Sequence, residues 1–327
     1  NGLEEAVPIM AEYYLKNHTA EQLRDYFMKF PNVDPDDKVA RVLLRIEIIG
    51  AFEGAGKRAK EESAKLAAKT TVDNLFVQLK NDFKVEDMTP SILIKIGNYL
   101  RVNTSTPREA LSFYDEAVKR EDPGNLFPAL LGRAECYALN RADFDKAITD
   151  FQRVLDESPK AEHKESALFR IIELLYEKND YNNVAERAKV FLADGTGYAA
   201  SRKAANVQYY LAQSYDKRNM REDAIAMYAK VWATYMGNIK ISAPAMKRWM
   251  ELLWERNQPG TGDVYGDRQG AYVQGAKYIL STQHFKDKML EADRKLWDDV
   301  DRLVQQYEAN PDIKSLKEIE MEKEQGR

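Results

Sequence analysis

The residues of this sequence best suited to chemistry are few and far apart. The segment Gly54–Lys57, "GAGK", has the glycine and lysine that end a phosphate-binding loop. That loop also needs a glycine five residues before its second glycine, and a hydroxyl after the lysine. Ala51 and Arg58 occupy those two places. We therefore interpret the segment as a break in a helix that leads into a solvated, lysine-rich helix.

Histidine and cysteine offer no better site. His18, His163 and His284 fall in different segments, and none has the helical partner of a zinc or di-iron site. We expect all three to be surface histidines. The single cysteine, Cys136, excludes an internal disulfide and a cysteine cluster for zinc. Because it lies among packing residues, we expect a small buried apolar side chain.

One glycine-rich loop leaves a chemical alternative open. The segment 258–270 contains Asp263 and Asp267, whose carboxylates could bind calcium. It lacks the alternating ligands and closing glutamate of an EF-hand loop. The sequence thus predicts no catalytic residue, no metal ligand and no cofactor. The alternative is a metal- or ligand-dependent module, or an enzyme, built on this loop.

Composition limits the class of protein. The 327 residues include 31% charged residues of interspersed sign, with a formal net charge of −4. That balance argues against a nucleic-acid or membrane-surface protein. Only 16 glycines and 11 prolines are present, as in helical proteins. We expect no membrane span, because no apolar run approaches about 18 residues. The chain begins at Asn1, so we expect a mature or trimmed form with any signal peptide or lipid anchor upstream.

The elements of the chain recur at a near-constant interval. Four segments place apolar or aromatic residues at positions i, i+4 and i+7, which lie on one face of a helix. The first residues of successive segments are 37, 37 and 40 positions apart. The four sets are Ala110, Tyr114, Ala117; Ala147, Phe151, Val154; Val184, Ala188, Phe191; and Ala224, Tyr228, Val231. Each of the four segments is preceded by another amphipathic helix and a short polar turn. This order predicts stacked antiparallel helix hairpins.

This pattern resembles the tetratricopeptide repeat. The family places small and aromatic residues in the first helix, then alanine and aromatic residues in the second, with proline near the end. Gly132–Tyr137, Ala147, Phe151 and Pro159 match it, and so do Tyr209–Tyr215, Ala224 and Tyr228. Val184 departs from the expected alanine, and the intervals exceed the usual length of about 34 residues. The long units and the linker "SPKAEHKESALFRI" resemble bacterial cell-envelope members, such as outer-membrane assembly and Tol-associated coordinator proteins.

The predicted fold is an all-α solenoid of about six antiparallel helix hairpins. The resemblance to the family implies that its superhelix is right-handed. We expect divergent N-terminal hairpins over residues 1–89 and the repeat array over 90–285. The segment 286–327 should hold a C-terminal capping helix and tail, because open repeat stacks need a polar-backed cap. In that helix Lys295, Asp298, Asp299, Arg302 and Gln305 form the polar side.

The resemblance also implies a binding surface. In this family some first-helix positions face the inside of the superhelix, where members bind extended peptides or helices. The matching residues here are Ser166, Phe169, Glu173, Tyr176, Glu177, Asn206, Tyr209, Gln213, Asp216, Lys217, Lys247, Glu251, Trp254 and Glu255. The alternative is that these residues are merely solvated, or are covered by the ends of the protein. The lysine and asparagine clamp of chaperone-binding members is incomplete, because Ile94 and Gly132 interrupt it.

We therefore expect a non-catalytic scaffold that binds a protein or peptide segment in its concave groove. Acidic residues mixed with aromatic ones predict a partner in which Lys or Arg alternates with apolar residues. The resemblance to envelope proteins implies a periplasmic or outer-membrane-associated location, with the cytoplasm as alternative. A structural subunit that oligomerises through its outer helices is a third hypothesis.

Overall fold

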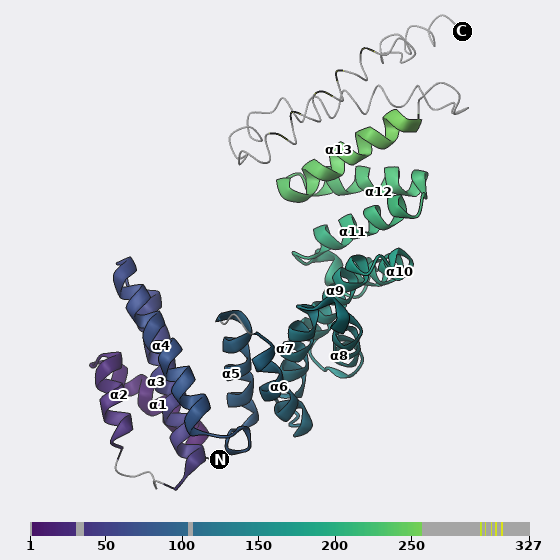
Figure 1. Cartoon of the computed structure of the whole chain (residues 1–327). Helices are drawn as coiled ribbons and strands as arrows, with labels where there is room; N and C mark the ends of the chain where they lie inside the picture. The colour runs from purple at the N-terminus through teal and green to yellow at the C-terminus, as the bar shows by residue number, and fades with distance from the viewer. Residues whose placement is uncertain are drawn as a thin grey trace, which may run out of the picture. The chain divides into compact units, whose positions relative to one another are not determined.

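The computed structural model describes residues 2–30, 36–103 and 107–256, together with positions 295, 298, 302, 305 and 309. Every regular element in these ranges is an α-helix or a short 3₁₀ turn, so the all-α prediction is confirmed for them. The chain divides into two compact units, Asn1–Lys164 and Glu165–Arg327, which we call unit 1 and unit 2. Figure 1 shows the helices of each unit in chain order.

Unit 1 begins with a pair of helices, within the segment 1–89 where N-terminal hairpins are predicted. Helix α1 spans Gly2–Leu15 and α2 spans Ala20–Met28. Thr19 caps α2: its hydroxyl accepts from the Gln22 amide, and the Gln22 side chain accepts from the Thr19 amide. This reciprocal capping box satisfies two amides that the first turn would otherwise leave unpaired.

The next hairpin corrects the interpretation of "GAGK". Helix α3 runs without a break over Lys38–Arg58, and α4 spans Glu62–Asp82. Glycine inside a helix costs about 1 kcal/mol, which is why the sequence indicated a break. A Cβ atom at Gly56 would lie 3.1 Å from the Ala68 Cβ atom of α4. The close approach of the two helices therefore favours glycine at this position, and the helix continues past it.

The repeats of unit 1 follow. They comprise α5 (Pro90–Asn103), α6 (Ala110–Lys119), α7 (Leu126–Ala138) and α8 (Phe144–Glu157). The predicted packing faces of α6 and α8 are buried, with Ala147, Phe151 and Val154 fully inaccessible to solvent. Helix α8 ends just before Pro159, as predicted.

One aromatic ring organises the packing of α5, α6 and α7. Tyr114 of α6 is fully buried, and its hydroxyl donates to Asn98 Oδ1 at 2.7 Å. A Cβ atom at Gly97 would lie 2.8 Å from this ring, and one at Gly132 only 2.2 Å. The ring is therefore wedged between two first helices, at places where only glycine leaves room for it.

Unit 2 holds further helix hairpins. It contains most of α9 (Ala161–Glu177), then α10 (Tyr181–Leu192), α11 (Ala204–Lys217), α12 (Arg221–Thr234) and α13 (Ile239–Arg256). The predicted packing residues of α10 and α12 are buried, among them Val184 and Ala224. Helix α10 ends at Leu192, shortly before Gly195.

The C-terminal predictions fall largely outside the described residues. Lys295, Asp298, Arg302 and Gln305 are helical and exposed, as the polar side of the expected helix should be. The capping role of the helix expected in 286–327 and the superhelix handedness stay predictions. Across the parts of the chain that the structure describes, the helices are too short or too polar to cross a bilayer.

Candidate partner-binding surface

The described residues with catalytic or metal-binding potential are His18, Cys136 and His163, which belong to different segments of unit 1. His18 is exposed and stacks on Tyr14, with ring centroids 4.0 Å apart. His163 differs from its prediction, because it is half-buried and hydrogen-bonds to Ser158 Oγ at 3.1 Å. Burial, aided by Lys160, lowers the pKa of His163. His284, Asp263 and Asp267 lie outside the described residues.

Cys136 behaves as the sequence predicts. It is buried in α7, and desolvation raises the pKa of its thiol to about 11. A thiol with so high a pKa is a poor nucleophile at neutral pH. Within the described ranges, no three His, Cys, Asp or Glu side chains gather closely enough to hold a metal ion.

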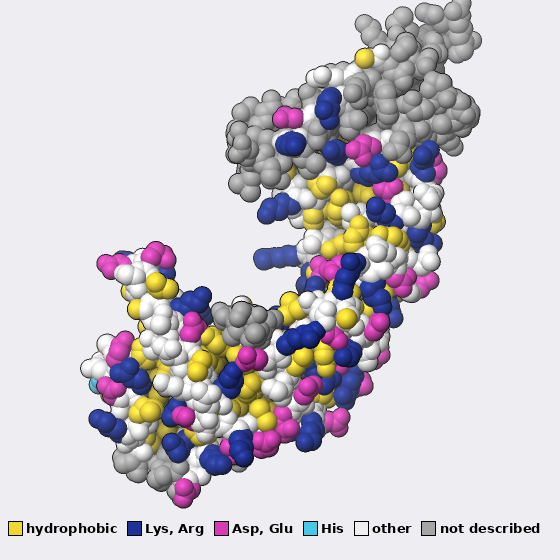
Figure 2. Space-filling view, viewed as in Figure 1, with side chains coloured by type: hydrophobic (Ala, Val, Ile, Leu, Met, Phe, Trp, Pro, Cys, Tyr) yellow, Lys and Arg dark blue, Asp and Glu magenta, His cyan; other side chains and the backbone are white. Residues whose placement is uncertain are grey.

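The predicted binding residues lie on the first helices of unit 2. We call the following set the first-helix face: Phe169, Glu173, Tyr176 and Glu177 of α9, Tyr209, Gln213 and Asp216 of α11, and Lys247 and Glu251 of α13. Glu177 is exposed, and the others are half-buried. The side chains of Trp254 and Glu255 lie outside the described residues. In the space-filling view, hydrophobic side chains alternate with Lys and Arg over α11 and α12 (Figure 2).

Aromatic contacts join the first helices of adjacent repeats. The rings of Tyr176 on α9 and Tyr210 on α11 lie 5.0 Å apart in a tilted arrangement. Tyr181, at the start of α10, meets Tyr176 edge-on at 5.6 Å. Burial, followed by the charge of Glu173, raises the pKa of Tyr210 to about 12. At neutral pH Tyr210 is therefore a neutral ring with a hydroxyl group able to donate or accept.

Polar bonds continue along the same face. The Tyr210 hydroxyl donates to Glu173 Oε1 at 3.4 Å, and Arg170 forms an ion pair with the other oxygen of Glu173. On α11, Asp216 accepts two hydrogen bonds from Arg248 of α13, at 2.7 and 3.0 Å. The third nitrogen of this guanidinium group donates to Glu251 at 3.0 Å. Three predicted acids thus already have arginine partners.

Two predicted residues face more to the interior than expected. Tyr209 meets Tyr228 of α12 edge-on at 6.0 Å, and burial raises the pKa of Tyr209 to about 12. Phe169 lies 5.8 Å beneath the ammonium group of Lys203, which also donates to Ser166 at 2.9 Å. Tyr209 thus packs within its own hairpin, and Phe169 contacts the residue that precedes α11.

Tyr210 and Arg248 were not among the predicted site residues. Tyr210 follows Tyr209 directly, and a single sequence does not show which of two adjacent tyrosines turns toward α9. Arg248 lies one position after Lys247, and its role depends on a carboxylate 32 residues earlier in the chain. The available indication was the i, i+3 spacing to Glu251, which is common on helices.

The comparison with family models agrees with the predicted repeat at two places. The family model described as "Tetratricopeptide repeat" matches residues 128–161 and 206–235. No curated protein matches the chain. A solved structure of the tetratricopeptide repeat domain of P58(IPK) aligns over 94% of this chain and 99% of its own, with 14% identity and a TM-score of 0.29.

The two matched segments correspond to the α7–α8 and α11–α12 hairpins, one in each unit. Both contain the buried alanine and aromatic pair on which the sequence prediction rested. Repeats of this kind are protein-interaction modules, which supports a scaffold role. The chain therefore contains segments that match the tetratricopeptide repeat, at residues 128–161 and 206–235.

Proposed function

We propose that this chain is a non-catalytic scaffold that binds a segment of another protein across the first-helix face of unit 2. The observation that carries the proposal is the contact between Tyr176 and Tyr210, two half-buried rings on adjacent first helices. Half-exposed tyrosines with fixed neighbours make good anchors, because they bury a large area at low cost in conformational entropy.

The charges on this face modify the partner expected from sequence. Glu173, Asp216 and Glu251 are each paired with an arginine, so they attract an incoming cation less than isolated acids would. We therefore propose that apolar side chains of the partner make the main contacts. Lys or Arg residues in the partner then add orientation and a modest gain in association rate.

A photo-crosslinking residue tests where the partner docks. Glu177 on the first-helix face and Glu186 on α10 are both exposed, and they make a matched pair of positions. We expect a partner adduct in cells from the Glu177 position and none from Glu186. Adducts from Glu186 alone would place the interface on the second helices and overturn the proposal.

Alanine substitutions then measure the anchors. Tyr176→Ala and Tyr210→Ala are each expected to weaken binding of the captured partner by about 2 kcal/mol. Val190 on α10 is 53% exposed, so Val190→Ala is the control and should leave affinity unchanged. Surface plasmon resonance gives the affinities, and circular dichroism confirms that the variants fold. Unchanged affinity in both tyrosine variants would exclude them as anchors.

The non-catalytic part of the proposal has its own test. Calorimetric titration of the full chain with calcium and zinc is expected to show no stoichiometric site. A micromolar site that disappears when Asp263 and Asp267 are changed to asparagine would instead favour a metal-dependent module on the 258–270 loop.

We also propose a periplasmic or outer-membrane-associated location in a bacterium. The support is the likeness of the long units and linkers to envelope members of the family. Fractionation of native cells with an antibody against this chain tests it directly, and recovery from the cytoplasm alone would refute it.

A further inference from the structure

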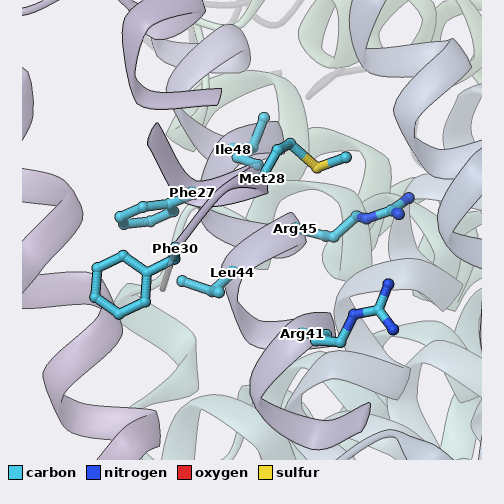
Figure 3. Close-up of a pocket in the computed structure, with 7 residues that line it drawn as sticks. All are labelled: Phe27, Met28, Phe30, Arg41, Leu44, Arg45 and Ile48. Carbon is cyan, nitrogen blue, oxygen red and sulfur yellow. The ribbon is translucent and has the colours of Figure 1, made fainter. Parts of the chain in front are cut away.

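A small pocket lies in unit 1, between the end of α2 and the middle of α3. It has a volume of about 250 Å³ and is lined by Phe27, Met28, Phe30, Arg41, Leu44, Arg45 and Ile48. Figure 3 shows its two sides: Phe27, Phe30 and Leu44 lie together on one side, and Met28 and the two arginines lie on the other. None of the residues that line the pocket belongs to the first-helix face.

The apolar side is held in place by packing. Phe27, Leu44 and Ile48 are at most 5% exposed, so they form a fixed base. Phe30 meets Phe27 at 6.1 Å and Tyr26 at 5.4 Å, in both cases edge-on. Met28 is 56% exposed, and its flexible thioether can adapt to an occupant.

The two arginines on the other side of the pocket are also held in place by contacts. Arg41 and Arg45 stand one turn apart on α3, and their guanidinium groups extend in the same direction (Figure 3). Both lie over the ring of Phe83, at 5.8 and 5.7 Å. Arg45 also pairs with Asp82 at 2.8 Å. A guanidinium group has five N–H donors, so the Asp82 ion pair leaves donors of Arg45 available to a second carboxylate.

The size and charge of the pocket limit its occupant. Its volume lies below the roughly 300–1,000 Å³ of pockets that enclose drug-sized molecules. It can hold one large aliphatic or aromatic side chain. Two arginines at the rim favour a carboxylate next to that side chain, because arginine binds carboxylates with directed, charge-assisted hydrogen bonds.

We propose that this pocket is a second docking site, which binds a protein segment carrying one large apolar side chain flanked by Asp or Glu. Its charge preference is the opposite of any preference for basic residues on the first-helix face. Since the pocket and that face lie in different units, either site can fail experimentally without affecting the other.

Methyl NMR of the full chain tests the proposal. The probe is an acetylated, amidated pentapeptide of sequence Gly-Asp-Leu-Asp-Gly. We expect saturable shifts of the Met28, Leu44 and Ile48 methyl groups. A second peptide, with asparagine in place of both aspartates, should bind about fivefold more weakly or worse, because it loses the charge-assisted contacts.

Three substitutions separate recognition from folding. Arg41→Gln and Arg45→Gln should each weaken the aspartate peptide about fivefold and leave the asparagine peptide unchanged. Arg24→Gln is the matched control, because Arg24 pairs with Asp25 and does not line the pocket. Unchanged methyl spectra of the free variants show that the fold is intact.

Three results would overturn the proposal. The first is the absence of shifts at the three methyl groups, and the second is equal binding of both peptides. The third is tighter binding of decanoate than of the aspartate peptide at the same methyl groups, which would make the pocket a site for small amphiphiles. Binding of the aspartate peptide that depends on both arginines supports it.

Discussion

Tyr114 in unit 1 and Tyr228 in unit 2 occupy the same position of the repeat, but their surroundings differ. Tyr114 is wedged between Gly97 and Gly132 and donates to the neutral amide oxygen of Asn98. Tyr228 meets the ring of Tyr209 and donates to the carboxylate of Asp216 at 3.3 Å. In these two repeats the position therefore holds a buried ring with an acceptor for its hydroxyl. It does not require one kind of neighbour.

An arginine clamp accompanies each ring, and again the details differ. In unit 1, Arg133 of α7 binds both oxygens of Asp150 on α8 at 2.8 Å, and it reaches Asp115 of α6 at 3.0 Å. In unit 2, Arg248 holds the same Asp216 that accepts from Tyr228. The ring and the clamp are thus separate in unit 1 and joined in unit 2. We expect the unit 1 residues to act independently and the unit 2 residues to act together.

The largest expected effect comes from filling the glycine gap. In Gly132→Ala the new Cβ atom would lie 2.2 Å from Tyr114, so the ring or a helix must move. We expect a loss of about 3 kcal/mol in unfolding free energy. Gly124→Ala is the control, because Gly124 is exposed and its Cβ atom would meet only Asp122 at 3.4 Å. Urea unfolding followed by circular dichroism measures both; equal stabilities would mean that the wedge is misplaced.

Removal of the clamps comes next. Arg133→Gln leaves the buried carboxylate of Asp150 without its main partner, and we expect a loss of about 2 kcal/mol. Arg248→Gln should cost about 1 kcal/mol, because Asp216 is more exposed and keeps the hydroxyl of Tyr228. Arg153→Gln, which breaks only exposed ion pairs, is the control. An Arg248→Gln loss as large as that of Arg133→Gln would contradict the contrast between the units.

Alkaline pH provides a third contrast. Burial raises the pKa of Tyr114 to about 12 and, with the charge of Asp216, raises that of Tyr228 further. A tyrosine with a raised pKa stabilises the folded state fully below its unfolded pKa near 10, and this stability is lost as pH rises through the folded pKa. We expect each ring to account for about 1.4 kcal/mol of the stability lost by pH 11.

The corresponding measurement is urea unfolding at pH 8 and pH 11. Tyr114→Phe and Tyr228→Phe should each reduce the difference between the unfolding free energies at pH 8 and pH 11. Tyr13→Phe should not, because Tyr13 is 73% exposed. Identical pH differences in all three variants would show that these two rings do not determine the alkaline loss.

The smallest effect is expected at neutral pH from the same two hydroxyl groups. Tyr114→Phe loses a 2.7 Å hydrogen bond, and we expect a cost of about 1 kcal/mol. Tyr228→Phe loses a 3.3 Å bond to a carboxylate that Arg248 still holds, so about half that cost is expected. A larger cost for Tyr228→Phe than for Tyr114→Phe would indicate that Tyr228 and Arg248 are coupled through Asp216 more strongly than the bond lengths suggest.

Periodicity predicted most of the fold, because the buried faces recur at the same helical spacing. Ala147, Phe151 and Val154 were assigned to the core from spacing alone, and all three are fully buried. The continuity of α3 through Gly54 and Gly56 was not predicted. It depends on contact with Ala68 in the partner helix, and local propensity does not contain that contact.

The binding surfaces were less predictable than the fold. The sequence placed Tyr176, Glu173 and Asp216 on first helices, and the structure puts them there. It did not show that Arg170 and Arg248 neutralise the acids, because those pairings depend on side-chain direction and on neighbouring repeats. The pocket beside Arg41 and Arg45 was also not predicted. Its two walls come from different helices, and no sequence pattern reports the space between them.

The linker between α10 and α11 has a practical consequence. Gly195 and Gly197 adopt φ angles of 95° and 76°, and a Cβ atom at either would have no neighbour within 4 Å. Glycine is thus needed for the turn and not for packing. The longest interval of the repeat includes this turn, yet Ala224 and Tyr228 beyond it are buried as in the shorter repeats. The hydroxyl of Thr196 donates to the carbonyls of Phe191 and Ala193 at the end of α10, so this residue should be kept. An epitope tag or fluorescent reporter inserted after the exposed Asp194 would be displayed at the surface.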